Sequence, residues 1–108
     1  MLHIQAFIID TLAVVQPLVR VIEGQDVDLG RQMRRAASSI ALNVAEGAYS
    51  KGRNEKARFH TALGSANETL ACLQVAVAFG YIDAPEPAVL DRFQRIIATL
   101  KNLTRSRR

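Results

Sequence analysis

The stretch RQMRRAASSIALNVAEGAYSKGRNEKARF, residues 31–59, decides the fold. It reads as a helix with two apolar faces, then a short polar turn, then the start of a second helix. The first face has the spacing of a helix that packs on a core: Leu29, Met33, Ala36, Ile40 and Val44. The second face consists of small residues: Ala37, Ala41, Ala45 and Ala48. Either this helix lies at the centre of a bundle, or its alanines contact another subunit.

Helical periodicity continues on both sides of this stretch. It predicts four helices with short turns between them, near residues 2–22, 28–48, 55–79 and 85–104. Pro17 falls inside the first helix and should kink or divide it, because proline removes one backbone hydrogen bond. Short connections place consecutive helices side by side in opposite directions. The sequence therefore predicts an all-α fold, in which residues 1–108 form a single up-down-up-down antiparallel four-helix bundle.

The third helix has the most regular apolar stripe, with alternating spacings of four and three that predict a seam in the core: Phe59, Leu63, Ala66, Leu70, Leu73 and Val77.

The expected ends of the helices follow from capping residues. Asp26 or Asp28 can cap the second helix, and Asn54 the third. Gly80 suits a left-handed cap. Asp83 and Glu86 have the spacing of a capping box for the fourth helix, in which prolines 85 and 87 fit the first turn.

Two strings, RRAASSIALNVAEG and SKGRNEKARFHTALGSANETLACLQVA, resemble the four-helix-bundle family named after proteins encoded in 23S rRNA intervening sequences. The resemblance spans nearly the whole chain and is densest over residues 32–81. It rests on residues 34–38, 43–47 and 62–65. It implies a cyclic homo-oligomer, a pentamer, with a link to RNA. A related set, the accessory proteins of diversity-generating retroelements, forms basic pentamers that bind a reverse transcriptase and nucleic acid. This chain lacks a feature that assigns it to that set.

Composition limits the class of protein. A chain of 108 residues with 49% hydrophobic residues suits one domain with one core. The single cysteine, Cys72, lies between leucines and is interpreted as a buried structural thiol. The N-terminal segment lacks the basic start of a secretory signal, and Asp10 interrupts its apolar run. We expect no segment long enough to span a bilayer, no membrane partner and a cytoplasmic location.

The sequence offers no set of catalytic or metal-binding residues. Di-metal helical bundles use Glu-x-x-His pairs, and no glutamate here is followed by such a histidine. The two histidines, His3 and His60, stand alone, and no serine has a histidine base at a recognisable spacing. Gly64 is isolated within a helix, which indicates close helix approach rather than ligand binding. We therefore expect no enzyme, no metal and no cofactor.

The element Asn43, Glu46 and Gly47 is the one polar motif that needs an explanation. Glu46 lies near the C-terminal end of its helix, where the helix dipole disfavours a negative charge. Lys56 and Arg58 lie near the start of the next helix, where a positive charge is equally disfavoured. Since the turn brings those ends together, we interpret the motif as a structural ion pair. A catalytic glutamate is the alternative, but no base or metal accompanies it.

Charge is unevenly distributed along the chain. The net charges of residues 1–30, 31–58, 59–90 and 91–108 are −3, +5, −3 and +5, which give the total of +4. In an up-down bundle the second turn and the C-terminus share one end. The basic residues expected there are Lys51, Arg53, Lys56, Arg58, Lys101, Arg105, Arg107 and Arg108. We expect acidic residues at the opposite end, where Arg31 neutralises part of their charge: Glu23, Asp26, Asp28, Asp83 and Glu86.

Two classes of function follow, and both stay open. The first is a non-enzymatic oligomer whose basic end contacts phosphates of RNA or DNA. The second is an oligomeric scaffold for a protein partner, in which the positive charge serves solubility. Only Tyr49 lies near the basic turn as an aromatic for base stacking, so the sequence does not predict sequence-specific reading of single strands.

Overall fold

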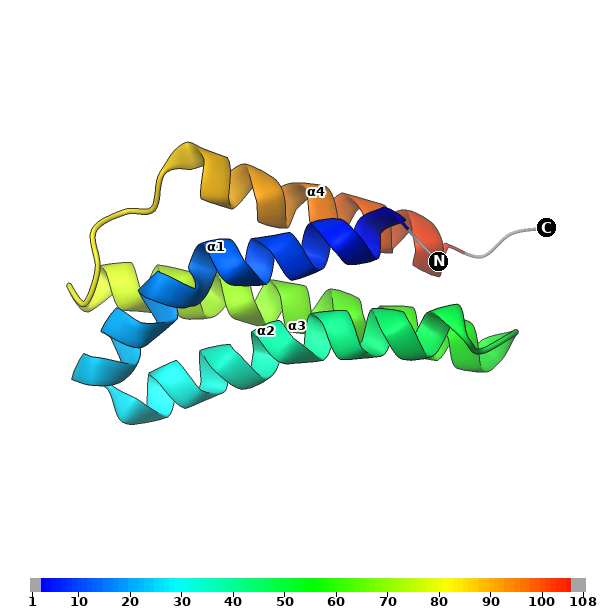
Figure 1. The fold of residues 1–108 in the computed structure, drawn as a ribbon, viewed down its shortest axis with the longest axis horizontal. Helices are drawn as coiled ribbons and strands as arrows, with labels where there is room; N and C mark the ends of the chain where they lie inside the picture. The colour runs from blue at the N-terminus through cyan, green and yellow to red at the C-terminus, as the bar shows by residue number, and fades with distance from the viewer. Residues whose placement is uncertain (1–2, 106–108) are drawn as a thin grey trace.

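The structure is a computed structural model that describes residues 3–105. Within that range it consists of helices and connecting turns, with no strand. The helices are α1 (His3–Gln25), α2 (Val27–Ala48), α3 (Arg53–Ala78) and α4 (Pro87–Thr104). They lie side by side along the length of the molecule (Figure 1). The expected all-α class with four helices is confirmed, and the helix bounds differ from the expected ones by three residues or fewer, counting only described residues.

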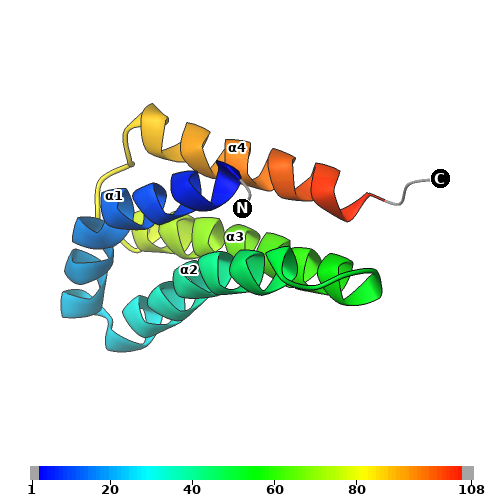
Figure 2. The ribbon, with the colours of Figure 1, turned by 45° about the vertical axis from the view of Figure 1, so that its right-hand side comes forward.

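Pro17 does not divide α1, which is continuous over 23 residues. The helix bends along its length instead, and its last turns point away from the direction of its first turns (Figures 1 and 2). The expectation that no segment is long enough to span a bilayer was wrong, because α1 is long and apolar enough by length and composition. The core helix of a soluble protein meets the same two criteria, and α1 buries one face against the other helices: Ile4, Ile8, Thr11, Val15, Val19 and Ile22.

The contact between α2 and α3 is the most extensive in the molecule, and it contains a small polar network. The hydroxyl of Ser65 donates to the hydroxyl of Ser39 at 2.8 Å. The amide of Asn43 donates to both the hydroxyl and the carbonyl of Ser39, each at 2.9 Å. Nearer the other end, the amide of Gln32 donates to Glu68 at 3.4 Å. The contacts of Ser39, Asn43 and Ser65 satisfy polar groups between the middles of two packed helices, whereas the bond between Gln32 and Glu68 is exposed.

The first half of the small face of α2 is buried within the chain, whereas Ala45 is half-buried and Ala48 is exposed. Ala37 and Ala41 are both buried, and the Gln5 amide of α1 donates to the Ala41 carbonyl at 3.1 Å. At the start of α2, a Cβ on Gly30 would lie 2.5 Å from the Glu23 Cα, so only glycine allows that backbone approach. For these positions the bundle interpretation applies. Their small side chains allow α1 to come close.

The predicted seam of α3 is shifted sideways in the structure. The helix buries Phe59, Ala62, Ser65, Ala66, Thr69, Cys72, Leu73 and Ala76. Leu63, Leu70 and Val77 are half-buried at the edge of this face. The reason is that α3 packs most heavily on α2 and only second on α4. The buried face of α3 is therefore centred toward α2. It contains Ser65 and Cys72 in place of the half-buried members of the predicted seam.

A polar and aromatic cluster joins α1 to α4. The guanidinium groups of Arg92 and Arg95 lie 4.6 and 4.5 Å from the centre of the Phe7 ring. Arg92 also donates to Asp10 at 2.7 Å and to the hydroxyl of Thr11 at 2.9 Å. Cation–π contacts of this kind stabilise by about 0.5–2 kcal/mol. The cluster strengthens a helix pair that otherwise shares little contact.

Capping was only partly predictable. Asp26 caps α2, because its carboxylate accepts from the Leu29 backbone N–H at 3.0 Å. Gly80 has φ +76° and ends α3 in a Schellman motif: the Gly80 N–H donates to Val77 and the Tyr81 N–H to Ala76. Two other predicted caps were wrong. The N-cap of α3 is Gly52, so Asn54 lies inside the helix, and the N-cap of α4 is Glu86, whose side chain makes no capping bond.

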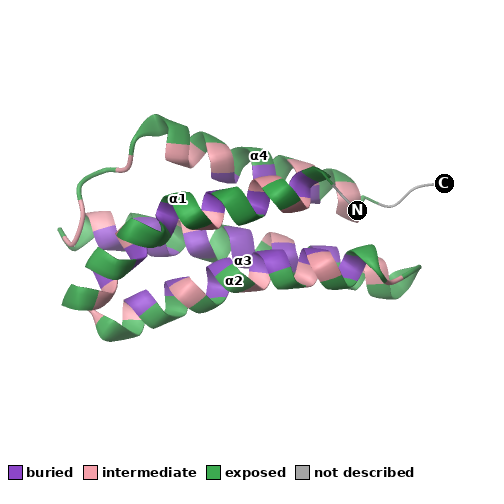
Figure 3. Ribbon diagram, in the orientation of Figure 1, coloured by how far each residue is buried: buried purple, intermediate pink, exposed green. Residues whose placement is uncertain are grey.

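Burial follows the inward faces of the helices. In Figure 3, buried segments alternate with exposed ones along each helix, and the α3–α4 connection is exposed or half-buried. The largest fully buried side chains come from all four helices and include Phe93, Ile8, Met33 and Leu73. One hydrophobic core therefore holds the four helices together.

Candidate nucleic-acid interface

The basic end of the molecule is built on the turn between α2 and α3. The backbone N–H of Tyr49 closes the end of α2 by donating to the carbonyl of Glu46 at 3.2 Å. Gly52 then adopts φ +65°, a conformation that glycine adopts without strain, and α3 begins at Arg53 without a side-chain cap. The first N–H groups of α3 thus remain open to water or to an anion.

The predicted ion pair across this turn is present. A guanidinium nitrogen of Arg58 lies 3.8 Å from Glu46, and a second one donates to the side-chain oxygen of Asn43 at 3.4 Å. Both charged side chains are at least half exposed. At these distances and exposures the pair contributes about 0–1 kcal/mol. Arg58 is therefore tethered loosely, and the partner of Glu46 is Arg58 rather than Lys56.

Gly47 has a separate role from its charged neighbour. A Cβ at this position would lie 2.5 Å from Cε1 and 2.8 Å from Cδ1 of Phe59. Phe59 is 3% exposed and lies at the start of the buried face of α3. The glycine therefore leaves space for a ring that fixes α3 against the end of α2. The sequence motif combines a packing role at Gly47 with an ion pair at Glu46.

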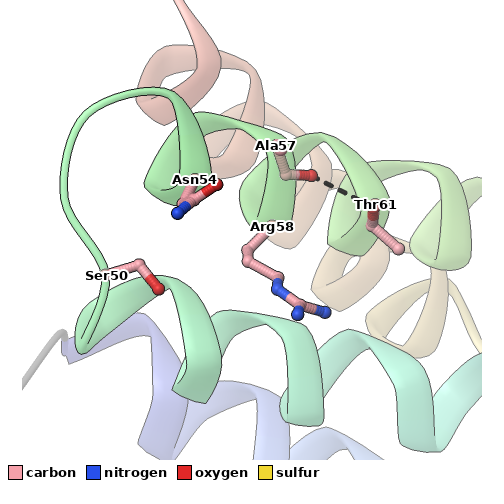
Figure 4. Close-up of a pocket in the computed structure, with 5 residues that line it drawn as sticks. All are labelled: Ser50, Asn54, Ala57, Arg58 and Thr61. Atoms are coloured by element: carbon pink, nitrogen blue, oxygen red, sulfur yellow. Dashed lines mark hydrogen bonds between the residues drawn. The ribbon is translucent and has the colours of Figure 1, made fainter.

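A solvent-open hollow of about 400 Å³ lies beside this turn, lined by Ser50, Asn54, Ala57, Arg58 and Thr61 (Figure 4). The Ser50 hydroxyl donates to the carbonyl of Glu46 at 2.9 Å, and the Thr61 hydroxyl donates to that of Ala57 at 3.0 Å. The side chains of Asn54 and Arg58 line the hollow together with Ser50 and Thr61. Such a polar, basic surface can hold water or a phosphate group. It is too open to enclose a small substrate.

The structure places the described basic residues as follows. Lys51 and Arg53 are exposed in the turn and the first position of α3, and Lys56 is half-buried. Lys101 and Arg105 are exposed at the end of α4. Both views show that end of α4 at the same end of the molecule as the α2–α3 turn (Figures 1 and 2). The last two predicted residues, Arg107 and Arg108, lie outside the described residues.

Two of the acidic residues predicted for the opposite end, Glu23 and Asp26, make contacts within the fold. Glu23 accepts from Arg34 at 2.7 Å. Asp26 caps α2 and also accepts from the Tyr81 hydroxyl at 3.0 Å, which raises the pKa of Tyr81 above its ordinary value. Asp28, Asp83 and Glu86 are exposed. This end holds the helices together through polar contacts, whereas the basic end makes few.

Nothing in the described part of the chain resembles a metal or thiol site. Over residues 3–105, no three His, Cys, Asp or Glu side chains come together as a metal-binding group. Cys72 is 3% exposed, and burial together with the nearby charge of Glu68 raises the pKa of its thiol. A buried thiol held in its neutral form is a weak nucleophile.

Sequence reasoning missed two features of the structure. It did not identify Ser50 and Thr61 as hydroxyls that share one hollow with Arg58. The sequence could have placed Thr61 beside Arg58, since the two are three residues apart on one helix. It also assigned no role to Arg92 and Arg95, which contact Phe7 and so do not add to the basic end.

The fold and this surface define a small all-helical protein of four helices that presents an open basic end. The family model described as 23S rRNA-intervening sequence protein matches residues 11–103, and the chain belongs to that family. The match includes all of α2 and α3 and most of α1 and α4, so the resemblance found in the sequence is confirmed. Searches of curated proteins and of solved structures gave no significant match.

Proposed function

We propose that this protein is an up-down-up-down four-helix bundle that assembles into a cyclic homo-oligomer, a pentamer, and binds RNA or DNA through its basic end. It acts by binding, not by catalysis. The observation that supports this most is the excess of positive charge at one end. The turn carries the acids Glu46 and Glu55, whereas the described basic residues at this end number six: Lys51, Arg53, Lys56, Arg58, Lys101 and Arg105.

The length of the molecule keeps this charge effective. The molecule is 46 Å long, whereas the Debye length at physiological salt is about 8 Å. The acidic end therefore does not neutralise the basic end. Basic side chains that are exposed and loosely tethered can each contact a phosphate, and such contacts give binding that tolerates many sequences.

Assembly would increase the effect of a modest charge. A cyclic oligomer repeats the same end around one axis, so that several subunits contact neighbouring phosphates at once and their weak affinities combine. The family description names 23S rRNA, which makes structured RNA the first nucleic acid to test. The single exposed aromatic at the turn, Tyr49, is 93% exposed and adds at most one stacking contact per subunit.

The test compares two matched variants in an electrophoretic binding assay with a structured RNA at low salt. Replacing Lys51, Arg53 and Lys56 with Gln should weaken binding across all RNA sequences, because three phosphate contacts per subunit are lost. The control replaces Arg20, which is exposed on α1 away from the turn, with Gln and should bind nearly as wild type does. An equal loss of RNA affinity in both variants would contradict an interface localised at the turn.

A scaffold that binds a protein partner is the second candidate function. It is favoured by two exposed apolar side chains on one side of α1, Val14 and Val21, which are seven residues apart and 40% and 50% exposed. Exposed apolar positions of this kind mark protein contacts when they form one surface. If the wild-type protein binds neither RNA nor DNA at low salt, the scaffold function replaces the nucleic-acid function.

A further inference from the structure

The outer side of α3 carries a second heptad pattern that the core does not use. Its positions alternate spacings of four and three, and all are exposed: Ala57, Thr61, Gly64, Glu68, Ala71, Val75 and Ala78. We name this set the α3 outer row. Four of its members, seven residues apart, are alanine or glycine. No atom outside the backbone of its own helix lies within 4 Å of a Cβ built on Gly64, so nothing among residues 3–105 explains a glycine in mid-helix, where it weakens the helix relative to alanine.

A matching pattern runs along the outer side of α2. It consists of Arg31, Arg35, Ser38, Leu42, Ala45 and Tyr49, of which only Ala45 is half-buried. We name this set the α2 outer row. Leu42 and Tyr49 are among the most exposed large apolar side chains of the described chain, at 65% and 93%. They are seven residues apart, the spacing of the small residues on the α3 outer row. One row thus carries protruding side chains, and the other carries gaps.

The two rows also carry opposite charges. The only charged residues of the α2 outer row are Arg31 and Arg35, and neither forms an ion pair among residues 3–105. The only charged residue of the α3 outer row is Glu68, whose one hydrogen bond comes from Gln32 at 3.4 Å. A Leu42 side chain in the gap at Gly64 would be flanked by an attractive Arg–Glu pair.

The contacts within one chain show which residues share a height along the bundle. Gln32 contacts Glu68, Ser39 contacts Ser65, and Glu46 contacts Arg58. Arg35 follows Gln32 by less than one helical turn, so it lies near the height of Glu68. Leu42 lies between Ser39 and Glu46, which places it near the height of Thr61 and Gly64. A rotation about an axis parallel to the helices leaves these heights unchanged.

We propose that the α2 outer row of one subunit packs against the α3 outer row of a second copy of this chain. In a ring whose axis is parallel to the helices, Arg35 then meets Glu68 of the next subunit, and Leu42 fits against Gly64. This contact uses a different surface on each partner, and such a contact generates a closed ring when the rotation between neighbouring subunits closes on itself. The inference rests on the proposed homo-oligomer and identifies the surfaces that hold it together.

The test uses charge reversal, with molar mass measured by light scattering after size exclusion at one fixed protein concentration. Arg35→Glu places like charges against Glu68, and Glu68→Arg does the same against Arg35. Each variant should assemble at least tenfold more weakly than wild type. Mixing the two variants should restore large particles that contain both chains, because up to four of the five contacts in a mixed pentamer then join opposite charges. Recovery in the mixture distinguishes a contact between subunits from one within a subunit.

A second variant separates assembly from folding. Gly64→Leu fills the proposed gap but meets no atom of its own chain near its Cβ, so its helical signal should persist while assembly weakens. The matched control is Ile9→Glu on the exposed side of α1, which should assemble as wild type does. A monomeric wild type would overturn the oligomer itself. A wild-type oligomer that resists both charge reversals, or that only Ile9→Glu dissociates, would overturn this interface alone.

Discussion

Replacing Gly47 with alanine tests the packing role that the structure gives to the end of α2 without touching any charge. The new methyl group would lie 2.5 Å from Cε1 of Phe59, about 1 Å inside ordinary van der Waals contact, so the ring must move. Phe59 is 3% exposed and has little room to do so. Overpacking of this kind costs about 1–3 kcal/mol, whereas alanine in place of glycine returns at most about 1 kcal/mol of helix propensity. We expect a net loss of about 1 kcal/mol.

Thermal unfolding followed by circular dichroism measures this change, at one protein concentration because assembly makes the melting temperature concentration-dependent. For a domain of this size, 1 kcal/mol corresponds to a shift of about 4–8 °C. The control repeats the substitution in a Phe59→Leu background. There the obstruction is reduced, so Gly47→Ala should be neutral or stabilising, and the two changes should be clearly non-additive. A single variant as stable as wild type would refute the reasoning.

Three further predictions use the same unfolding assay. Leu73→Ala should lose about 2–5 kcal/mol, because Leu73 is fully buried, whereas Leu70→Ala should lose clearly less because Leu70 is half-buried; equal losses would show that the core face is misassigned. Arg58→Gln should lower stability slightly, by less than about 1 kcal/mol, and Arg53→Gln should not, since only Arg58 pairs with Glu46. The raised pKa of Tyr81 means that its bond to Asp26 stabilises the fold below the ordinary tyrosine pKa and is lost as pH rises through the folded-state pKa, so Tyr81→Phe should flatten the alkaline loss of stability; an unchanged pH profile would argue against that bond.

Periodicity predicted the number and approximate bounds of the helices because each helix buries a face of regularly spaced apolar residues. It misplaced the buried face of α3. Periodicity shows that a helix has an apolar side, but it does not show that α3 packs more extensively on α2 than on α4. Leu70 was therefore predicted in the core and lies at its edge, while Thr69 is fully buried. The Thr69 hydroxyl is satisfied by the carbonyl of Ser65, a bond that apolar patterns do not register.

The candidate site was predictable where it depended on charge and not where it depended on shape. The uneven charge along the chain, together with short turns, was enough to bring Lys51, Arg53 and Lys101 to one end. The dipole argument also identified the pairing of Glu46 with a base of the next helix. The hollow beside Arg58 and the contact of Gly47 with Phe59 require distances between residues of different helices. A single sequence does not contain those distances.

The most direct test of the proposed function is the salt dependence of RNA binding by the wild-type protein, measured by fluorescence anisotropy with one structured RNA. If exposed basic side chains at the turn contact phosphates, the logarithm of the affinity should fall linearly with the logarithm of the salt concentration, by about 0.9 per phosphate contact on a duplex. Replacing Lys51, Arg53 and Lys56 with Gln should make that slope shallower. The absence of binding at low salt, or a slope that those replacements leave unchanged, would contradict the proposal.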